Sequence, residues 1–261
     1  MALVVYGDFS DPLSQVASQR VDVLKGRGAE VEWRAVAARE TILVHAQPAD
    51  DRFDQRYDDV QQWCASALLP GERGLPEKPR TMPFPDQPVA GYAEAVGAGV
   101  EDFVRHLIFD AYWNRGVDIG NPAALRHLLV LPIMHGDSPS DILSFSGDAI
   151  GMFGGPMTGA AYHLMKEWRE AWQALGSPEL PVLQDGDTVF AGFDAVKQLG
   201  RLLGGQAAVT VAGNPYALPP MPVENRWLSI PRPGRRPLWW DTPIGVGAPE
   251  SRDRPAELVG R

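Results

Sequence analysis

The stretch that decides the fold is the run from residue 3 to residue 14, which reads Leu3-Val4-Val5-Tyr6-Gly7-Asp8-Phe9-Ser10-Asp11-Pro12-Leu13-Ser14. Its first four residues are apolar or aromatic and stop at Gly7, which predicts a short strand. Asp11 is a strong helix N-cap and Pro12 suits the first helical position, so a helix is expected to begin here. Apolar residues then recur at helical spacing, at Leu13, Val16, Ala17, Val21 and Leu24.

A second strand is predicted over residues 30–36, after Gly26 and Gly28 have ended the helix. Within it Val31, Trp33 and Ala35 alternate with polar residues and share one face. Strand, helix and strand in this order imply a parallel pair of strands with a right-handed crossover.

Helices fill the middle of the chain, and a hairpin with one more helix follows. The spacing predicts helices over 50–70, 91–113, 123–131, 138–143 and 160–175, with a Pro-rich connector at 70–88 and a Gly-rich loop at 147–159. Residues 181–190 read as a hairpin with an Asp-Gly turn, before a helix over 193–203. This order predicts an α/β thioredoxin-like fold with a large all-helical insertion. The expected domains are 1–46 together with 178–205, the insertion 47–177, and an extension 206–261.

The C-terminal extension differs in composition from the rest of the chain. Residues 206–261 hold ten prolines, three tryptophans, seven basic and five acidic residues, whereas the whole chain carries a net charge of −9. One interpretation is an extended arm that lies along its own acidic body. The other is an arm that binds a protein partner or a second copy of the chain, with tryptophans as anchors.

Composition excludes several classes of function. Apolar residues make up 44% and charged residues 22% of the chain, as in a folded soluble protein. The acidic balance argues against nucleic acid as a partner. No stretch reaches the roughly 20 apolar residues of a membrane span. With no signal peptide recognised and one cysteine, the expected location is cytoplasmic. The five histidines show no metal-ligand spacing, so no metal is expected.

Three segments in this order resemble the DsbA-like branch of the thioredoxin superfamily. The first, residues 5–14, looks like a strand followed by the signature D-F-x-C-P-x-C. The second, residues 109–125 (FDAYWNRGVDIGNPAAL), is similar to the helical insertion of FrnE-like proteins and 2-hydroxychromene-2-carboxylate isomerases. The third, Leu180-Pro181-Val182-Leu183, matches the cis-proline loop and the strand after it.

The resemblance also shows what this chain lacks. Asp11 and Ser14 stand at the two cysteine positions, so dithiol–disulfide exchange at this site is chemically excluded. Cys64 has no partner cysteine and is expected to be a buried, inert thiol. In the kappa-class glutathione transferases and the isomerases, which the chain also resembles, a serine at the first position acts on a glutathione thiol. Asp11 would instead repel a thiolate at this position.

The resemblance implies candidate site residues and a ligand class. Asp11 and Ser14 are the candidate catalytic residues, Asp11 as a general base or ligand contact and Ser14 as a hydrogen-bond donor. A helix cap alone is the competing interpretation of Asp11. The candidate substrate-binding residues are Phe9, Pro12, Leu180 and Pro181, of which Leu180 would offer its backbone.

Two functions follow from these residues. In the first, the protein binds a small molecule or a conjugate of glutathione or mycothiol and has isomerase- or transferase-like activity. This hypothesis predicts a cleft between the core and the insertion, with Asp11, Ser14 and Leu180 exposed in it. In the second, it is a non-catalytic interaction protein whose cleft and Trp/Pro-rich extension hold a protein partner or form a homodimer.

Overall fold

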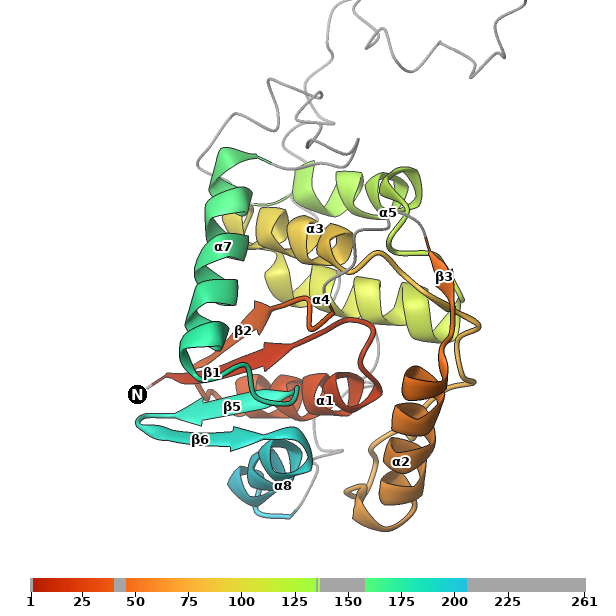
Figure 1. Cartoon of the computed structure of the whole chain (residues 1–261). Helices are drawn as coiled ribbons and strands as arrows, with labels where there is room; N and C mark the ends of the chain where they lie inside the picture. The colour runs from red at the N-terminus through yellow and green to blue at the C-terminus, as the bar shows by residue number, and fades with distance from the viewer. Residues whose placement is uncertain (1, 40–45, 135, 137–157, 206–261) are drawn as a thin grey trace, which may run out of the picture. The chain divides into compact units, whose positions relative to one another are not determined.

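The computed structural model describes residues 2–39, 46–134, 136 and 158–205 (Figure 1). Its main sheet has four strands in the order β2-β1-β5-β6. β1 pairs parallel with β2 and antiparallel with β5, and β5 pairs antiparallel with β6. The strands are β1 (Leu3–Gly7), β2 (Val31–Ala35), β5 (Val182–Asp185) and β6 (Thr188–Ala191).

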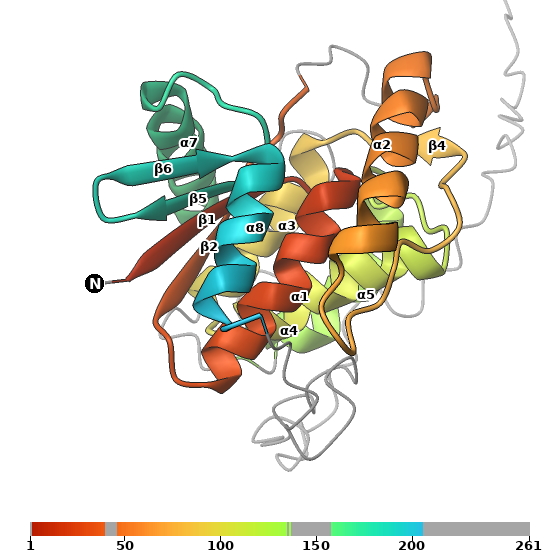
Figure 2. The same ribbon diagram turned by 90° about the horizontal axis from the view of Figure 1, so that it is seen from below.

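Helices cover both faces of this sheet. Helices α1 (Pro12–Gly26) and α8 (Gly192–Leu202) pack together on one face, in front of the strands in Figure 2. The other face carries α3 (Asp86–Gly97), α4 (Glu101–Phe109) and α7 (Gly159–Ala174), which lie above the strands in Figure 1. The order β–α–β, then helices, then β–β–α confirms the predicted thioredoxin-like class.

The remaining elements lie between β2 and α7 in the sequence. They are β3 (Gln47–Pro48), α2 (Asp51–Ala67), β4 (Thr81–Met82), the π-helical turn η1 (Asp110–Asn114) and α5 (Pro122–Met134). β3 and β4 form a small antiparallel sheet that the sequence pattern did not predict. A two-residue strand is too short to show alternation.

The predicted stripe of α1 is confirmed, because all five of its apolar residues are buried in the core. On β2, Val31, Trp33 and Ala35 are likewise buried on one face. The sequence pattern therefore identified both the first helix and the buried face of the edge strand.

The single helix predicted over 91–113 is wrong in its limits. Helix α3 already begins at Asp86, inside the predicted connector, and ends at Gly97. The chain then turns through Gly99, whose φ is +70°, before α4 begins at Glu101. A positive φ ends a helix, and glycine adopts it without steric strain. The predictions for 138–143, for 147–157 and for the extension 206–261 lie outside the described residues.

The segment 109–125, which carries one of the resemblances, contains three residues with clear structural roles: Trp113, Gly120 and Asn121. The π-helical turn places the Trp113 indole so that its Nε1 donates a hydrogen bond to the Phe9 carbonyl at 3.0 Å. Gly120 passes so close to Phe84 that a Cβ there would lie 2.2 Å from the Phe84 nitrogen. Asn121 then accepts hydrogen bonds from the first turn of α5. This segment thereby fastens the helical insertion to the loop that precedes α1.

Candidate functional site

The N-terminus of α1 is capped by Asp11. Asp11 Oδ2 accepts a hydrogen bond from the Ser14 backbone N–H at 2.6 Å and another from Ser14 Oγ at 2.7 Å. Its φ of −85° and ψ of 125° are the extended values typical of an N-cap, and Pro12 follows at the first helical position. The expected cap is therefore present, with the carboxylate where the first redox cysteine stands in the D-F-x-C-P-x-C signature.

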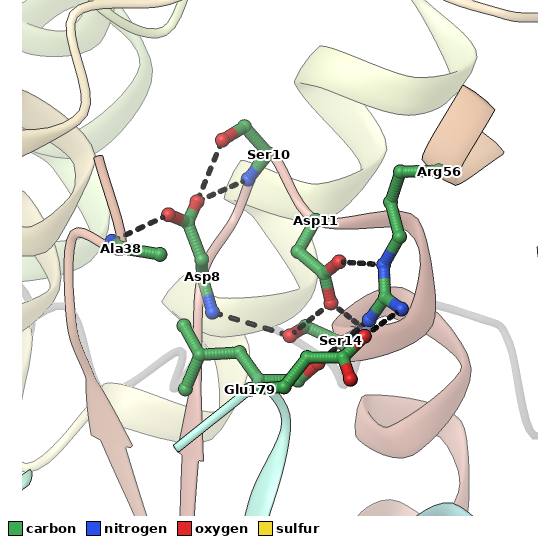
Figure 3. A network of polar contacts seen from close by, with 8 residues as sticks. Asp8, Ser10, Asp11, Ser14, Ala38, Arg56 and Glu179 are labelled. Atoms are coloured by element: carbon green, nitrogen blue, oxygen red, sulfur yellow. Dashed lines mark hydrogen bonds and ion pairs between the residues drawn. The ribbon is translucent and has the colours of Figure 1, made fainter. Parts of the chain in front are cut away.

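Ser14 is fully buried, so the expectation that it is exposed in a cleft is wrong. Its hydroxyl donates to Asp11 and accepts from the Asp8 backbone N–H at 3.3 Å (Figure 3). The first turn of α1 faces the core at this position. The Ser14 hydroxyl therefore donates one hydrogen bond and accepts another within the protein. Ser14 supports the Asp11 carboxylate and the β1–α1 loop from the core side.

Arg56 of α2 connects the two halves of the site. Its Nε lies 3.1 Å from Asp11 Oδ1, its Nη2 donates to the Leu180 carbonyl at 2.7 Å, and its Nη1 pairs with Glu179. Figure 3 shows the guanidinium group of Arg56 between Asp11 and Glu179. The side chain is only 20% exposed. One guanidinium thus joins α2 to two distant segments, one at Asp11 and the other at Glu179 and Leu180.

The segment before β5 has the cis-proline that the resemblance implied. The Leu180–Pro181 peptide bond is cis. The Trp172 indole donates to the Pro178 carbonyl at 3.1 Å and holds the segment against the end of α7. Leu180 was expected to be exposed in a cleft, and although it lines the cavity described below it is only 4% exposed. Its carbonyl is occupied by Arg56, but no hydrogen bond among the described residues uses its N–H.

Asp8 is a buried carboxyl group that the sequence analysis did not select. One oxygen accepts from the backbone N–H and the hydroxyl of Ser10 at 2.7 Å each, and the other from the Ala38 N–H at 3.0 Å. Burial raises the pKa of Asp8 above its ordinary value, and the nearby charge of Asp11 adds to this rise. The hydrogen bonds from Ser10 and Ala38 lower the pKa but do not cancel the effect of burial. An aspartate after a strand is common, so the sequence held no signal for this role.

These groups surround a cavity of ≈ 280 Å³ at the N-terminus of α1. It lies between the β1–α1 loop, the segment after β2, α2, β4 and the cis-proline segment. The side chains and backbone that line it belong to Asp8, Ser10, Asp11, Pro12, Ala38, Arg39, Phe53, Arg56, Met82, Trp172, Ser177, Pro178, Glu179 and Leu180.

Only part of the predicted site reaches this cavity. Asp11, Pro12 and Leu180 line it, whereas Phe9, Ser14 and Pro181 do not. Phe9 is 1% exposed and packs in an aromatic cluster with Tyr92 and Phe109. Among the lining residues that sequence analysis missed, Phe53 and Arg56 come from α2, whose helical pattern gives no sign of which residue faces α1.

The thiol of Cys64 lies outside the cavity, on α2. It is a free, buried cysteine, as expected, and burial raises its pKa to about 11. A thiol with this pKa is almost fully protonated near neutral pH, so it is a poor nucleophile. The described residues contain no cluster that could hold a metal ion and no helix that could span a membrane.

No protein-family model matches this sequence, and no curated protein matches it either. Solved structures do match. A 2-hydroxychromene-2-carboxylate isomerase superposes with a TM-score of 0.52 at 18% identity, over 78% of this chain and 95% of the other. The cytosolic disulfide reductase DsbM from Pseudomonas aeruginosa, solved with GSH, gives 0.50 at 13% identity, over 78% and 98%.

The protein has a DsbA-like thioredoxin fold. At these identities the likeness establishes the fold alone, because one fold serves many reactions. With a single cysteine in the sequence, this DsbA-like chain lacks the C-x-x-C pair. What the site can do must therefore be inferred from the groups around its cavity.

Proposed function

We propose that this DsbA-like protein binds a small molecule at the N-terminus of α1, and that its ligand is a thioether conjugate of a low-molecular-weight thiol such as glutathione or mycothiol. The observation that carries the proposal is the pairing of Asp11 with Ser14 and Arg56 beside the cavity. Asp11 and Ser14 occupy the two positions of a redox cysteine pair, and a cavity lies next to them.

The charges around the cavity favour a conjugate over a free thiolate. The carboxylates of Asp8 and Asp11 both line it, and a negative sulfur beside them would be repelled. A thioether sulfur carries no charge and avoids this repulsion. Arg39 lines the same cavity with its side chain 39% exposed. Its Nη1 lies 3.3 Å from Asp50 Oδ2, and its other N–H groups suit a ligand carboxylate.

The cis-proline segment supplies one backbone contact for such a ligand. The Leu180 carbonyl is occupied by Arg56, so the Leu180 N–H is the group left to donate to a ligand amide. A cavity of ≈ 280 Å³ is at the lower end of the range for ligand sites, so it would hold part of a tripeptide-sized molecule. Isomerase- or transferase-like chemistry would act on the part that projects from it.

Calorimetry with S-methylglutathione and reduced glutathione tests the proposal, together with mycothiol and its S-methyl derivative. We expect a saturable signal in which the S-methyl compound binds at least as tightly as the free thiol. Arg39→Ala should weaken binding about tenfold, whereas Arg52→Ala, an exposed arginine on α2 outside the cavity, should not. Failure of both S-methyl compounds to bind would refute the proposal.

A cytoplasmic location fits these thiols and remains part of the proposal. The alternative function, an interaction protein that uses its C-terminal arm or forms a homodimer, concerns residues 206–261 and is not favoured by any contact among the described residues.

A further inference from the structure

The cavity at the N-terminus of α1 contains one carboxylate that has no positive partner among the described residues. Three carboxylates line this cavity, those of Asp8, Asp11 and Glu179. Asp11 and Glu179 both pair with Arg56, whereas no ion pair among the described residues includes Asp8, which is 5% exposed. A buried charge is costly unless an opposite charge and hydrogen bonds compensate it. Asp8 is therefore the carboxylate that a positively charged ligand group would satisfy.

We propose, on the basis of the function proposed above, that Asp8 and Arg39 form a subsite for the α-amino-acid group of the ligand. Asp8 accepts a hydrogen bond from the ammonium of this group, and Arg39 donates to its carboxylate. The ligand class is then a thioether whose parent thiol carries a γ-glutamyl end, as glutathione does.

The hydrogen bonds of Asp8 leave one acceptor site unused. A carboxylate has about four acceptor sites, two on each oxygen. One oxygen of Asp8 accepts from both the N–H and the hydroxyl of Ser10 (Figure 3). The other accepts one hydrogen bond among the described residues, from the Ala38 N–H at 3.0 Å. A ligand ammonium group supplies both a donor for the remaining site and the missing positive charge.

The pKa of Asp8 agrees with a missing counter-charge. Burial and the charge of Asp11 both raise this pKa, and the hydrogen bonds from Ser10 and Ala38 do not cancel the rise. A positive group beside a carboxylate favours its charged form. An ammonium group at Asp8 would therefore offset both of the effects that disfavour the carboxylate there.

Arg39 lies close to Asp8 along the cavity wall. The Ala38 N–H that donates to Asp8 belongs to the residue before Arg39, and Arg39 lines the same cavity. The ammonium and carboxylate of an α-amino acid are attached to one carbon, so their protein partners must be close together. Arg39 Nη1 lies 3.3 Å from Asp50 Oδ2, in a pair whose side chains are 39% and 55% exposed. Such an exposed pair is weak, and the other N–H groups of Arg39 can donate to a ligand carboxylate.

This subsite distinguishes the two thiols named above. Glutathione carries a free ammonium and a free carboxylate on the α-carbon of its γ-glutamyl residue. In mycothiol the cysteine amine is acetylated and the cysteine carboxyl forms an amide with a sugar, so neither charge is present. The subsite thus favours a conjugate of glutathione. With the γ-glutamyl end at Asp8 and Arg39, the Leu180 N–H is left for an amide further along the ligand.

Calorimetry with three thioethers tests the inference. They are S-methylglutathione, its N-acetyl derivative, which lacks the ammonium charge, and S-methylmycothiol, which lacks both charges. We expect S-methylglutathione to bind the unmodified protein at least tenfold more tightly than either of the other two. Asp8→Asn should weaken the binding of S-methylglutathione about tenfold and leave that of the N-acetyl derivative nearly unchanged. The matched control Asp187→Asn changes an exposed aspartate of the β5–β6 turn, outside the cavity, and should alter neither affinity.

Two results would overturn the inference while leaving the proposed function in place. One is equal affinity for S-methylglutathione and either of the other thioethers. The other is an equal weakening of all three by Asp8→Asn, which a purely structural role of Asp8 predicts. Binding of neither S-methyl compound would instead refute the proposed function, and this inference with it. The comparison of ligands uses the unmodified protein, so it decides the question even if Asp8→Asn fails to fold.

Discussion

The indole ring of Trp33 occupies the space in which a side chain at Gly7 would stand. A Cβ placed on Gly7 would lie 2.2 Å from Trp33 Cζ2 and 2.6 Å from Cη2. Gly7 ends β1, and Trp33 belongs to the neighbouring parallel strand β2. The glycine after the first strand therefore has a packing role, because it lets a large ring from β2 lie across β1.

Gly7→Ala should consequently destabilise the protein. Trp33 is 2% exposed and surrounded by core residues, so it cannot move aside freely. Overpacking of this kind typically reduces the free energy of unfolding by about 1–3 kcal/mol. Urea denaturation measures the change. Gly97→Ala is the control, since a Cβ there meets nothing within 4 Å, and it should change stability by less than about 0.5 kcal/mol.

The buried ion pair between Arg20 and Glu72 gives a second prediction. Arg20 Nε lies 2.7 Å from Glu72 Oε1, and the two side chains are 2% and 3% exposed. Glu72→Ala would leave a buried guanidinium without its counter-charge, so we expect a loss of about 3–5 kcal/mol. Glu170→Ala, which breaks the exposed pair with Lys166, should cost less than about 0.5 kcal/mol by the same measurement. Similar losses in the two variants would contradict the role of burial.

Asp11 and Asp50 cap two helices in the same way, and their alanine variants separate the cap from the site. Each side chain accepts a hydrogen bond from the backbone N–H three residues later. Loss of a cap costs about 0.5–2 kcal/mol, which is expected for Asp50→Ala. Each carboxylate also pairs with an arginine, but Asp11 and Arg56 are 14% and 20% exposed whereas Asp50 and Arg39 are 55% and 39% exposed. Asp11→Ala should therefore cost more, because the pair that it breaks is the more buried one. Thermal unfolding of both variants tests this, and Asp11→Asn, which keeps an acceptor oxygen, should recover part of the loss.

The buried thiol of Cys64 makes the stability of the protein depend on pH in the alkaline range. Its thiol pKa is about 11 in the folded protein, above the ordinary value of a thiol, because burial disfavours the thiolate. The folded state therefore holds this proton more tightly, and the stabilisation present below the unfolded pKa is lost as the pH rises to about 11.

Cys64→Ala should accordingly lose less stability than the unmodified protein between pH 8.5 and 11. The same two proteins share every other titrating group, so the difference isolates the thiol. Ellman's reagent should react slowly with the folded protein at pH 8 and rapidly in urea. A fast reaction in the folded state would show that the thiol is accessible.

The sequence alone predicted the elements whose signals are local. The Asp11-Pro12 start of α1, the alternation of β2 and the hairpin were correct, as was the order β–α–β followed later by β–β–α. The resemblance supplied the cis bond before Pro181. Each of these depends on residues within one short segment.

The parts of the site that the sequence missed depend on contacts between distant segments. Arg56 lies 45 residues from Asp11 and 124 from Leu180, and nothing in the helical pattern of α2 indicates these contacts. Trp33 was predicted to share one face of its strand with Val31 and Ala35 and is buried there, but its position gave no sign that Trp168, 2% exposed on α7, belongs to the same core. The break between α3 and α4 was missed for a different reason, since apolar spacing continues through it.

The three contacts of the Arg56 guanidinium make two distant segments depend on one side chain of α2. These are the helix cap at Asp11 and the cis-proline segment, which contributes Glu179 and the Leu180 carbonyl. A change of charge in either segment would alter the electrostatic balance of the other. A change in the specificity of the proposed site would therefore require concerted substitutions, and a library that varies Asp11, Arg56 and Glu179 together would sample it more efficiently than separate scans.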